Sequence, residues 1–139
     1  FKTHPNLQPE QILFYKNQGY KGLVVEGTGM GHAAVTVGDP LSEPNKKNLD
    51  AFEELIKSGC IVVMTSQTIF GRVQMNVYAY GRELQRVGVI EGEDMTTETA
   101  FIKLAWLLGN YPNKAKELIQ KNLRGEITER SLYKKDFLN

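Results

Sequence analysis

Residues 60–64, Cys-Ile-Val-Val-Met, give the clearest strand signal in the sequence and decide its fold class. A short, continuous apolar run is typical of a strand that is buried on both faces, as in a parallel sheet. Residues 45–58 before it carry apolar side chains at i, i+3 and i+7, which predicts an amphipathic helix with Leu49, Phe52 and Ile56 inward. Residues 23–25 form a second apolar run. This alternation predicts an α/β domain with a small, mostly parallel sheet flanked by helices.

Four further helices are predicted from proline starts, polar caps and glycine stops. They run from Pro9 to Gly19, from about Tyr80 to Gly88, from a cap at Asp94 or Thr96 to Gly109, and from Pro112 to Gly125. The third is expected to bury Phe101, Leu104, Ala105 and Leu108, and the fourth Ala115, Leu118, Ile119 and Leu123. Residues 66–78 are expected to form an irregular loop with some extended structure.

Length and composition limit the class of protein. The sequence has 139 residues, of which 41% are hydrophobic, and residues 1–139 are expected to form one domain. The net charge of +1 gives no global field that would favour nucleic acid or an acidic membrane. No apolar run approaches the roughly 20 residues of a membrane helix, so we expect no membrane partner and a cytoplasmic location. Cys60 is the single cysteine, which excludes an internal disulfide, and it is expected to be buried and inert.

The N-terminus, Phe1 to Pro5, resembles the end of a strand that runs into a loop. This pattern suggests a piece of a longer chain.

Residues 24–32, Val-Val-Glu-Gly-Thr-Gly-Met-Gly-His, place glycines at every second position behind a strand. A dinucleotide fingerprint would need its third glycine at His32 and a helix starting within the loop, and a P-loop would need Gly-Lys-Ser/Thr. Both patterns are missing. Two interpretations remain: a tight turn that uses the positive φ of glycine, or a loop whose bare backbone approaches a ligand or a neighbouring subunit.

Polar side chains are concentrated between Thr65 and Leu84, behind the best strand. Arg72 could make a forked contact to a ligand carboxylate or pair with an acid of its own chain. Asn76 offers amide hydrogen bonds, and Tyr78 could contact a ligand or pack on a helix. His32 and His4 lack the companions of a metal site. The basic surplus of residues 114–135 fits a solvated helix face, with an RNA-facing patch as the alternative.

Residues 64–110 contain the segments Gly-Arg-Val-Gln-Met-Asn-Val-Tyr-Ala and Gly-Val-Ile-Glu-Gly-Glu-Asp-Met, followed by a Lys-Leu helix. These segments resemble the C-terminal domain of the type I asparaginase family. Within it, GYKGLVVEGTGMGHA, VVMTSQ, NVYAYGREL and GEITERS are similar to the D subunits of archaeal glutamyl-tRNA(Gln) amidotransferases. The resemblance covers nearly the whole chain.

The resemblance implies part of an enzyme. In that family a nucleophilic threonine, a second threonine, an aspartate and a lysine lie in an N-terminal domain, and their motifs do not occur here. We therefore expect no catalytic residue, no cofactor and no activity from this chain alone. The resemblance assigns it a homodimer interface and contacts to the amide substrate of a neighbouring active site. The expected substrate-binding or interface residues are Thr28, Gly29, Met30, Gly31, His32, Arg72, Asn76 and Tyr78.

Asparaginases of the periplasmic type carry asparagine where Met30 stands, which leaves contacts there to the backbone of Gly29 and Gly31. In the full assembly the resemblance implies hydrolysis of glutamine to glutamate and ammonia. An E-type partner subunit would use ATP to amidate tRNA-bound glutamate, so contact with tRNA would be indirect. The alternatives are the C-terminal domain of a type I L-asparaginase and a stand-alone nucleotide-binding or interaction module.

Overall fold

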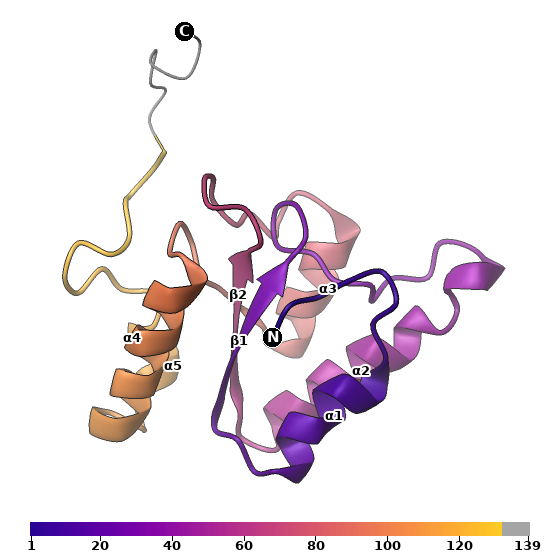
Figure 1. The fold of residues 1–139 in the computed structure, drawn as a ribbon, viewed down its shortest axis with the longest axis horizontal. Helices are drawn as coiled ribbons and strands as arrows, with labels where there is room; N and C mark the ends of the chain where they lie inside the picture. Colours follow the sequence, from indigo (N-terminus) through magenta and orange to yellow (C-terminus); the bar gives the residue numbers. More distant parts are fainter. Residues whose placement is uncertain (132–139) are drawn as a thin grey trace, which may run out of the picture.

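A three-stranded parallel sheet forms the centre of the structure, a computed structural model that describes residues 1–131 (Figure 1). The strands are β1 (Gly22–Gly27), β2 (Ile61–Ser66) and β3 (Ile90–Glu91), in the order β1-β2-β3. Both predicted strands are confirmed, whereas the two-residue β3 is too short to show a periodic pattern. The fold is α/β, as the alternation of helices and strands predicts.

Helices cover both faces of the sheet (Figure 1). One face packs on α1 (Pro9–Asn17), α2 (Asn45–Lys57) and α3 (Ala79–Val87), and the other on α4 (Thr97–Asn110) and α5 (Ala115–Leu118). A short 3-10 helix, η1 (Pro40–Ser42), precedes α2. Because β1 and β2 are buried on both sides, their residues divide between two apolar cores.

The N-terminal residues extend the sheet beside β1. Phe1 donates its N-terminal NH₃⁺ to Val24 O at 2.8 Å and accepts from Glu26 N at 2.8 Å, while Thr3 N donates to Glu26 O at 3.0 Å. Lys2 and Glu26 form a parallel bridge. The prediction that this segment is the end of a strand is therefore confirmed.

The helix α4 differs from the prediction in the face that it buries. Thr96 is its N-cap, and the helix continues past Gly109 to Asn110. Phe101 is 63% exposed and Ala105 is exposed, although the sequence predicts both to face inward. The side chains that are buried are Ala100, Lys103, Leu104 and Leu107. Apolar residues occupy more than one side of this helix, so their spacing alone does not define which side meets the sheet.

The predicted helix from Pro112 to Gly125 is wrong in length, since α5 covers Ala115–Leu118 only. Ala115 and Ile119 are buried as expected, but Leu123 is 38% exposed. Beyond Ile119, side chains compete for the backbone groups that a helix would use. Asn122 donates to Ile127 O and accepts from Gly125 N, both at 2.7 Å.

A buried ion pair fixes this C-terminal segment on α4. Lys103 Nζ lies 2.7 Å from Glu126 Oε1 and 2.6 Å from Lys121 O. Burial alone would raise the pKa of Glu126, but hydrogen bonds from Lys103 and from the amides of Leu123 and Arg124 outweigh it and lower that pKa to about 2. Lys103 lies on an otherwise apolar face of α4, and its ammonium group finds its partners in a segment about 20 residues further along the chain.

Within residues 1–131, no helix is both long and apolar enough to cross a membrane. The basic segment singled out in the sequence ends outside the described residues, where Lys134 and Lys135 lie.

Replacing two helical glycines, Gly81 and Gly109, by alanine is expected to change the stability of the protein in opposite directions. A Cβ on Gly81 of α3 would lie 2.7 Å from Met75 Cα and closer still to Met75 O, whereas one on Gly109 of α4 meets no atom within 4 Å. We expect Gly81→Ala to lower the free energy of unfolding by about 2 kcal/mol, and Gly109→Ala to raise it by about 0.5 to 1 kcal/mol. Urea denaturation of both variants tests this. An increase for Gly81→Ala would contradict the packing of α3 on Met75.

Replacing the buried carboxylate predicts a pH-dependent loss of stability. Glu126→Gln leaves Lys103 without its counter-charge, which we expect to cost about 2 kcal/mol at pH 7. Because the pKa of Glu126 falls from 4.5 to about 2 on folding, the wild type holds this contribution above pH 4.5 and loses it as the pH falls toward 2. The free energies of unfolding of the wild type and of Glu126→Gln, measured by denaturation from pH 7 to pH 2, should therefore converge as the pH falls. The matched control is Glu53→Gln, which removes an exposed helical pair with Lys57 and should change little at any pH.

Candidate functional site

Two loops lie side by side at the carboxyl ends of β1 and β2 (Figure 1). Residues 28–32, the glycine loop, follow β1, and residues 67–71, the polar loop, follow β2. Their strands end in register, with Gly27 opposite Ser66. Parallel sheets place ligand sites at this edge, since successive loops converge there.

The glycine loop is a tight turn closed on itself. Thr28 N donates to His32 O and His32 N to Thr28 O, both at 2.9 Å. Gly31 has a φ of +99°, and a Cβ there would approach Val73 Cγ1 to 2.6 Å, so only glycine fits. The next helical turn after β1 is η1 at Pro40, which agrees with the rejection of a phosphate-binding fingerprint.

Several backbone groups of this loop bind the rest of the domain. Gly31 N donates to Thr28 O at 3.1 Å, and Met30 O accepts from Gln74 N at 2.9 Å. Gly29 O accepts from Ser66 Oγ at 3.1 Å. The amide of Gly31, which the sequence suggested for a ligand, is therefore used inside the turn. The loop is held in one shape by its neighbours.

His32 and Tyr78 are brought together although 46 positions separate them. Their ring centroids lie 5.2 Å apart at an interplanar angle of 82°, and Tyr80 lies 6.1 Å from the same imidazole. The His32 Nε2 atom is buried without a hydrogen-bond partner, and burial lowers the pKa of this imidazole. A neutral ring beside two tyrosines can donate or accept one hydrogen bond from a polar ligand.

A small cavity of about 220 Å³ opens beside this imidazole. It is lined by Thr3, His4, Pro5, Thr28, His32, Ala33, Ala34 and Tyr80. The N-terminal strand, the glycine loop and α3 all contribute to it, so its shape depends on the complete domain.

Tyr78 and Asn76 lie on the segment that leads into α3. Tyr78 is the N-cap of that helix and is exposed, and Asn76 Nδ2 donates to Gln74 Oε1 at 3.0 Å. Arg82 NH1 donates to Asn76 O at 3.2 Å, which holds the segment on its own helix. Thus Tyr78 faces the glycine loop, whereas the Asn76 side chain bonds within its own segment.

The sequence allowed Arg72 to bind a ligand carboxylate or an acid of its own chain. In the structure it pairs with acids of its own chain. Its NH1 lies 2.7 Å from Glu93 Oε2, and its NH2 bonds to Thr128 O. Asp94 accepts from Thr128 N at 3.1 Å. Hydrogen bonds from Thr128 outweigh the effect of burial and lower the pKa of Asp94. The guanidinium therefore joins the residue that follows the polar loop to the C-terminal segment.

Two polar residues of this edge, Ser66 and Gln67, were not predicted from the sequence as site residues. Gln67 Nε2 donates to Thr3 O at 2.7 Å and to Glu26 O at 3.0 Å, and so ties the N-terminal strand to β1. The polar loop also exposes Ile69, at 82%, and Phe70. The Thr-Ser-Gln run at the carboxyl end of the best strand is the signal that could have identified Ser66 and Gln67.

Metal and thiol chemistry find no support among residues 1–131. No three His, Cys, Asp or Glu side chains of this part of the chain gather in a way that could hold a metal ion. Cys60 is buried at the opposite end of β2, and burial raises the pKa of its thiol to about 11. The prediction of a buried thiol is confirmed, and its raised pKa disfavours the reactive thiolate.

The sequence matches one known family over most of its length. The model of the glutaminase/asparaginase C-terminal domain matches residues 1–122. The chain belongs to this family. The glycine loop and the polar loop both lie within the residues that the family model matches.

Curated relatives of this domain include the D subunits of glutamyl-tRNA(Gln) amidotransferase from two archaea. The Methanococcus maripaludis S2 protein is 49% identical over 129 residues, which are 92% of this chain and 28% of the relative. The Methanobrevibacter smithii protein is 44% identical over 140 residues, which cover 99% and 29%. The chain thus spans less than a third of the length of the curated relatives it matches.

Solved structures of L-asparaginases share the fold. The Thermococcus kodakarensis enzyme matches with a TM-score of 0.79 and 31% identity, over 94% of this chain and 37% of that one. L-asparaginase I of Vibrio cholerae matches with a TM-score of 0.76 and 31% identity, over 92% and 36%. The expected asparaginase-like C-terminal fold is confirmed.

The imidazole of His32 gives a test of the site geometry. We expect NMR titration to give His32 a pKa below 6.5, because Tyr78 and Tyr80 keep water from the ring. Its uncharged form then stabilises the fold above pH 6.5, and this contribution is lost as the pH falls through the lowered pKa. In the double variant Tyr78→Ala, Tyr80→Ala, the pKa should return toward 6.5. Tyr111→Ala, far from the loop, is the control. A wild-type pKa at or above 6.5 would contradict the loss of water around this half-buried ring.

Proposed function

We propose that this chain is the C-terminal domain of the glutaminase subunit of a tRNA-dependent amidotransferase. The observation that carries the proposal is the 44–49% identity, over nearly all of the chain, to proteins named as D subunits of glutamyl-tRNA(Gln) amidotransferase. The complete subunit would hydrolyse glutamine to glutamate and ammonia. The ammonia would convert tRNA-bound glutamate to glutamine.

The geometry supports a role in completing an amide pocket rather than in the bond-breaking step. The glycine loop is rigidly held, carries the exposed Thr28 and places His32 against Tyr78. The polar loop exposes Ile69 beside it, as expected of a surface that another domain covers. A threonine nucleophile would come from a separate N-terminal domain, so the domain by itself is inactive.

The assembly that this function requires has several parts. The domain would pack on the N-terminal catalytic domain of its own subunit and on a second copy in a homodimer. An E-type partner subunit would bind ATP and tRNA, so this chain needs no cofactor and contacts tRNA indirectly. Such an assembly operates in the cytoplasm, where tRNA is charged.

A type I L-asparaginase is the second candidate, favoured by the TM-scores of 0.76 and 0.79 to two L-asparaginases. Their 31% identity is lower than that of the amidotransferase subunits, and for this reason glutamine is the preferred substrate of the proposal. A stand-alone nucleotide-binding module, the third candidate, lacks the helix that should begin in the glycine loop.

Kinetics of the full-length subunit test the pocket. We expect Thr28→Ala and Tyr78→Ala each to raise the KM for glutamine about tenfold, since either loss removes substrate contact without touching the threonine chemistry. Leu41→Ala, at a site 93% exposed on η1, is the matched control and should leave the KM unchanged. Ammonia release and glutaminyl-tRNA formation with the partner subunit are the two measurements.

Three results would contradict the proposal. An unchanged KM for glutamine in both variants would mean that this domain does not contribute to the pocket. Ammonia release by the 139-residue chain alone would mean that it carries a nucleophile of its own. Preference for asparagine, with no effect of tRNA or partner subunit, would assign the protein to the L-asparaginases.

A further inference from the structure

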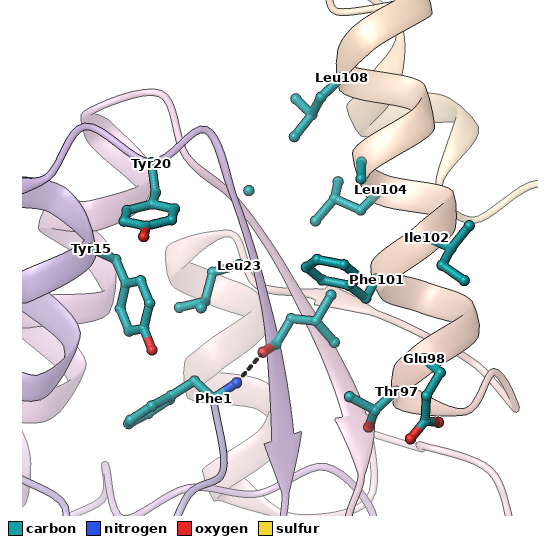
Figure 2. A pocket seen from close by; sticks show the side chains of 13 residues that line it. Phe1, Tyr15, Tyr20, Leu23, Thr97, Glu98, Phe101, Ile102, Leu104 and Leu108 are labelled. Carbon is teal, nitrogen blue, oxygen red and sulfur yellow. Dashed lines mark hydrogen bonds between the residues drawn. The ribbon is translucent and has the colours of Figure 1, made fainter.

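The two outer strands of the sheet, β1 and β3, are covered in different ways. At β1 the contact is backbone on backbone, since Phe1 donates its N-terminal NH₃⁺ to Val24 O beside an apolar cavity of about 590 Å³ (Figure 2). At β3 the covering segment is residues 73–75, which bond to β3 and to the turn after it. These residues lead directly to Tyr78, so the β3 edge supports one side of the candidate site.

A side chain replaces a backbone group at the β3 edge. Val73 N donates to Glu93 O at 2.9 Å, as in the first step of an antiparallel ladder. Two residues further on, a regular ladder would have Met75 N donate to Glu91 O. Met75 N donates instead to the carboxylate oxygen Glu91 Oε1, at 2.5 Å. The carboxylate therefore takes the place of a main-chain acceptor.

Burial makes this position unfavourable for a charge. Met75 is fully buried and Glu91 is half-buried. Burial raises the pKa of Glu91, the hydrogen bond from Met75 lowers it, and the charges of Glu93 and Arg72 act in opposite directions. A neutral acceptor of the same shape would avoid the cost of burying the charge. What the carboxylate supplies is a partner for a buried amide, which would otherwise be left unpaired.

The same carboxylate oxygen also binds α3. Gln85 Nε2, within α3, donates to Glu91 Oε1 at 3.3 Å. Tyr78 is the N-cap of this helix, so the two donors to Glu91 lie on either side of it in the sequence. The helix also packs on Met75 through Gly81, where no Cβ would fit. Tyr78 is thereby held between two points that are both fixed to β3.

The glycine loop contacts the same segment through the preceding amide. Gln74 N donates to Met30 O at 2.9 Å. Successive amides of an extended chain point in opposite directions, so one holds the glycine loop and the next holds β3. Without the bond to Glu91, the segment would keep only its contact on the loop side. The ring of Tyr78 would then lose its fixed place, 5.2 Å between centroids from His32.

We propose that Glu91 is a positioning residue, whose carboxylate holds residues 73–78 between β3 and the glycine loop and so keeps Tyr78 beside His32. Glu91 does not line the cavity beside His32, and it acts on the site through the segment that it binds. Its effect on substrate binding rests on the proposed function. Its effect on the position of the segment does not.

Hydrogen exchange of the full-length subunit tests the anchor itself. We expect the amide of Met75 to exchange at least about tenfold faster in Glu91→Ala. Glu91→Gln should exchange like the wild type, because its side-chain oxygen can accept the same bond. The amide of Val73 is the internal control, since it keeps its partner Glu93 O.

Equal exchange of Met75 in the wild type and in Glu91→Ala would overturn the proposal. If Glu91→Ala fails to fold, Glu91→Asp decides, because its carboxylate is one methylene further from Met75 N. Protection of Met75 in Glu91→Asp equal to that of the wild type would then overturn the proposal.

A double-mutant cycle in the full-length subunit tests whether Glu91 acts through Tyr78. We expect Glu91→Ala to raise the KM for glutamine about fivefold and to leave kcat within about twofold, whereas Glu91→Gln should keep both near the wild type. In the Tyr78→Ala background, Glu91→Ala should raise the KM by less than about twofold, because the side chain through which it acts is gone. Glu83→Ala, which removes a carboxylate of α3 that pairs with Arg86, is the matched control.

Two kinetic results would overturn the proposal. One is an equal rise of the KM on Glu91→Ala with and without Tyr78. The other is a rise of the same size in Glu91→Gln, which keeps the acceptor. A different result concerns the proposed function. Faster exchange of Met75 in Glu91→Ala, together with a KM that Tyr78→Ala leaves unchanged, would contradict the amide pocket and support the anchoring role of Glu91.

Discussion

The close approach of two glycines, Gly27 and Gly31, to Met64 of β2 is the constraint on which the site depends. A Cβ on Gly27 would lie 2.5 Å from Met64 Sδ, and one on Gly31 would lie 3.1 Å from Met64 Cγ. The thioether is fully buried and fills the space that these missing Cβ atoms leave. Any larger residue at Gly27 or Gly31 would push the glycine loop off the sheet, and His32 would lose its place beside Tyr78.

A second set of contacts holds the other side of the site from a distance. Arg72, directly after the polar loop, binds Glu93 and Thr128, and Lys103 joins α4 to Glu126. Both acceptors of the C-terminal segment, Thr128 and Glu126, lie within three residues. A short stretch after α5 therefore fastens both a site loop and a core helix, and its irregular backbone serves that purpose better than the predicted helix would.

Much of this fold could be predicted from local pattern. The strands at residues 23–25 and 60–64, the helix start at Pro9 and the glycine stops at Gly19, Gly59 and Gly88 depend on neighbours in sequence, and the structure contains them. The exposed side of α4 and the end of α5 could not be predicted, because they depend on which side of the helix meets the sheet and on what Asn122 and Glu126 bind. At the site, the glycine loop was predicted from its place behind a strand, whereas its partner Tyr78 required the tertiary fold.

The chain contains a single tryptophan, Trp106, which projects from α4. Its indole is 50% exposed, and its centroid lies 5.3 Å from that of Tyr111. It lines a cavity of about 470 Å³ together with Ile102 and Leu123. Indole emission shifts to shorter wavelength when water leaves the ring, so this helix carries its own fluorescent reporter. Any binding event that removes water from this face of α4 can thus be followed by fluorescence, with no label added.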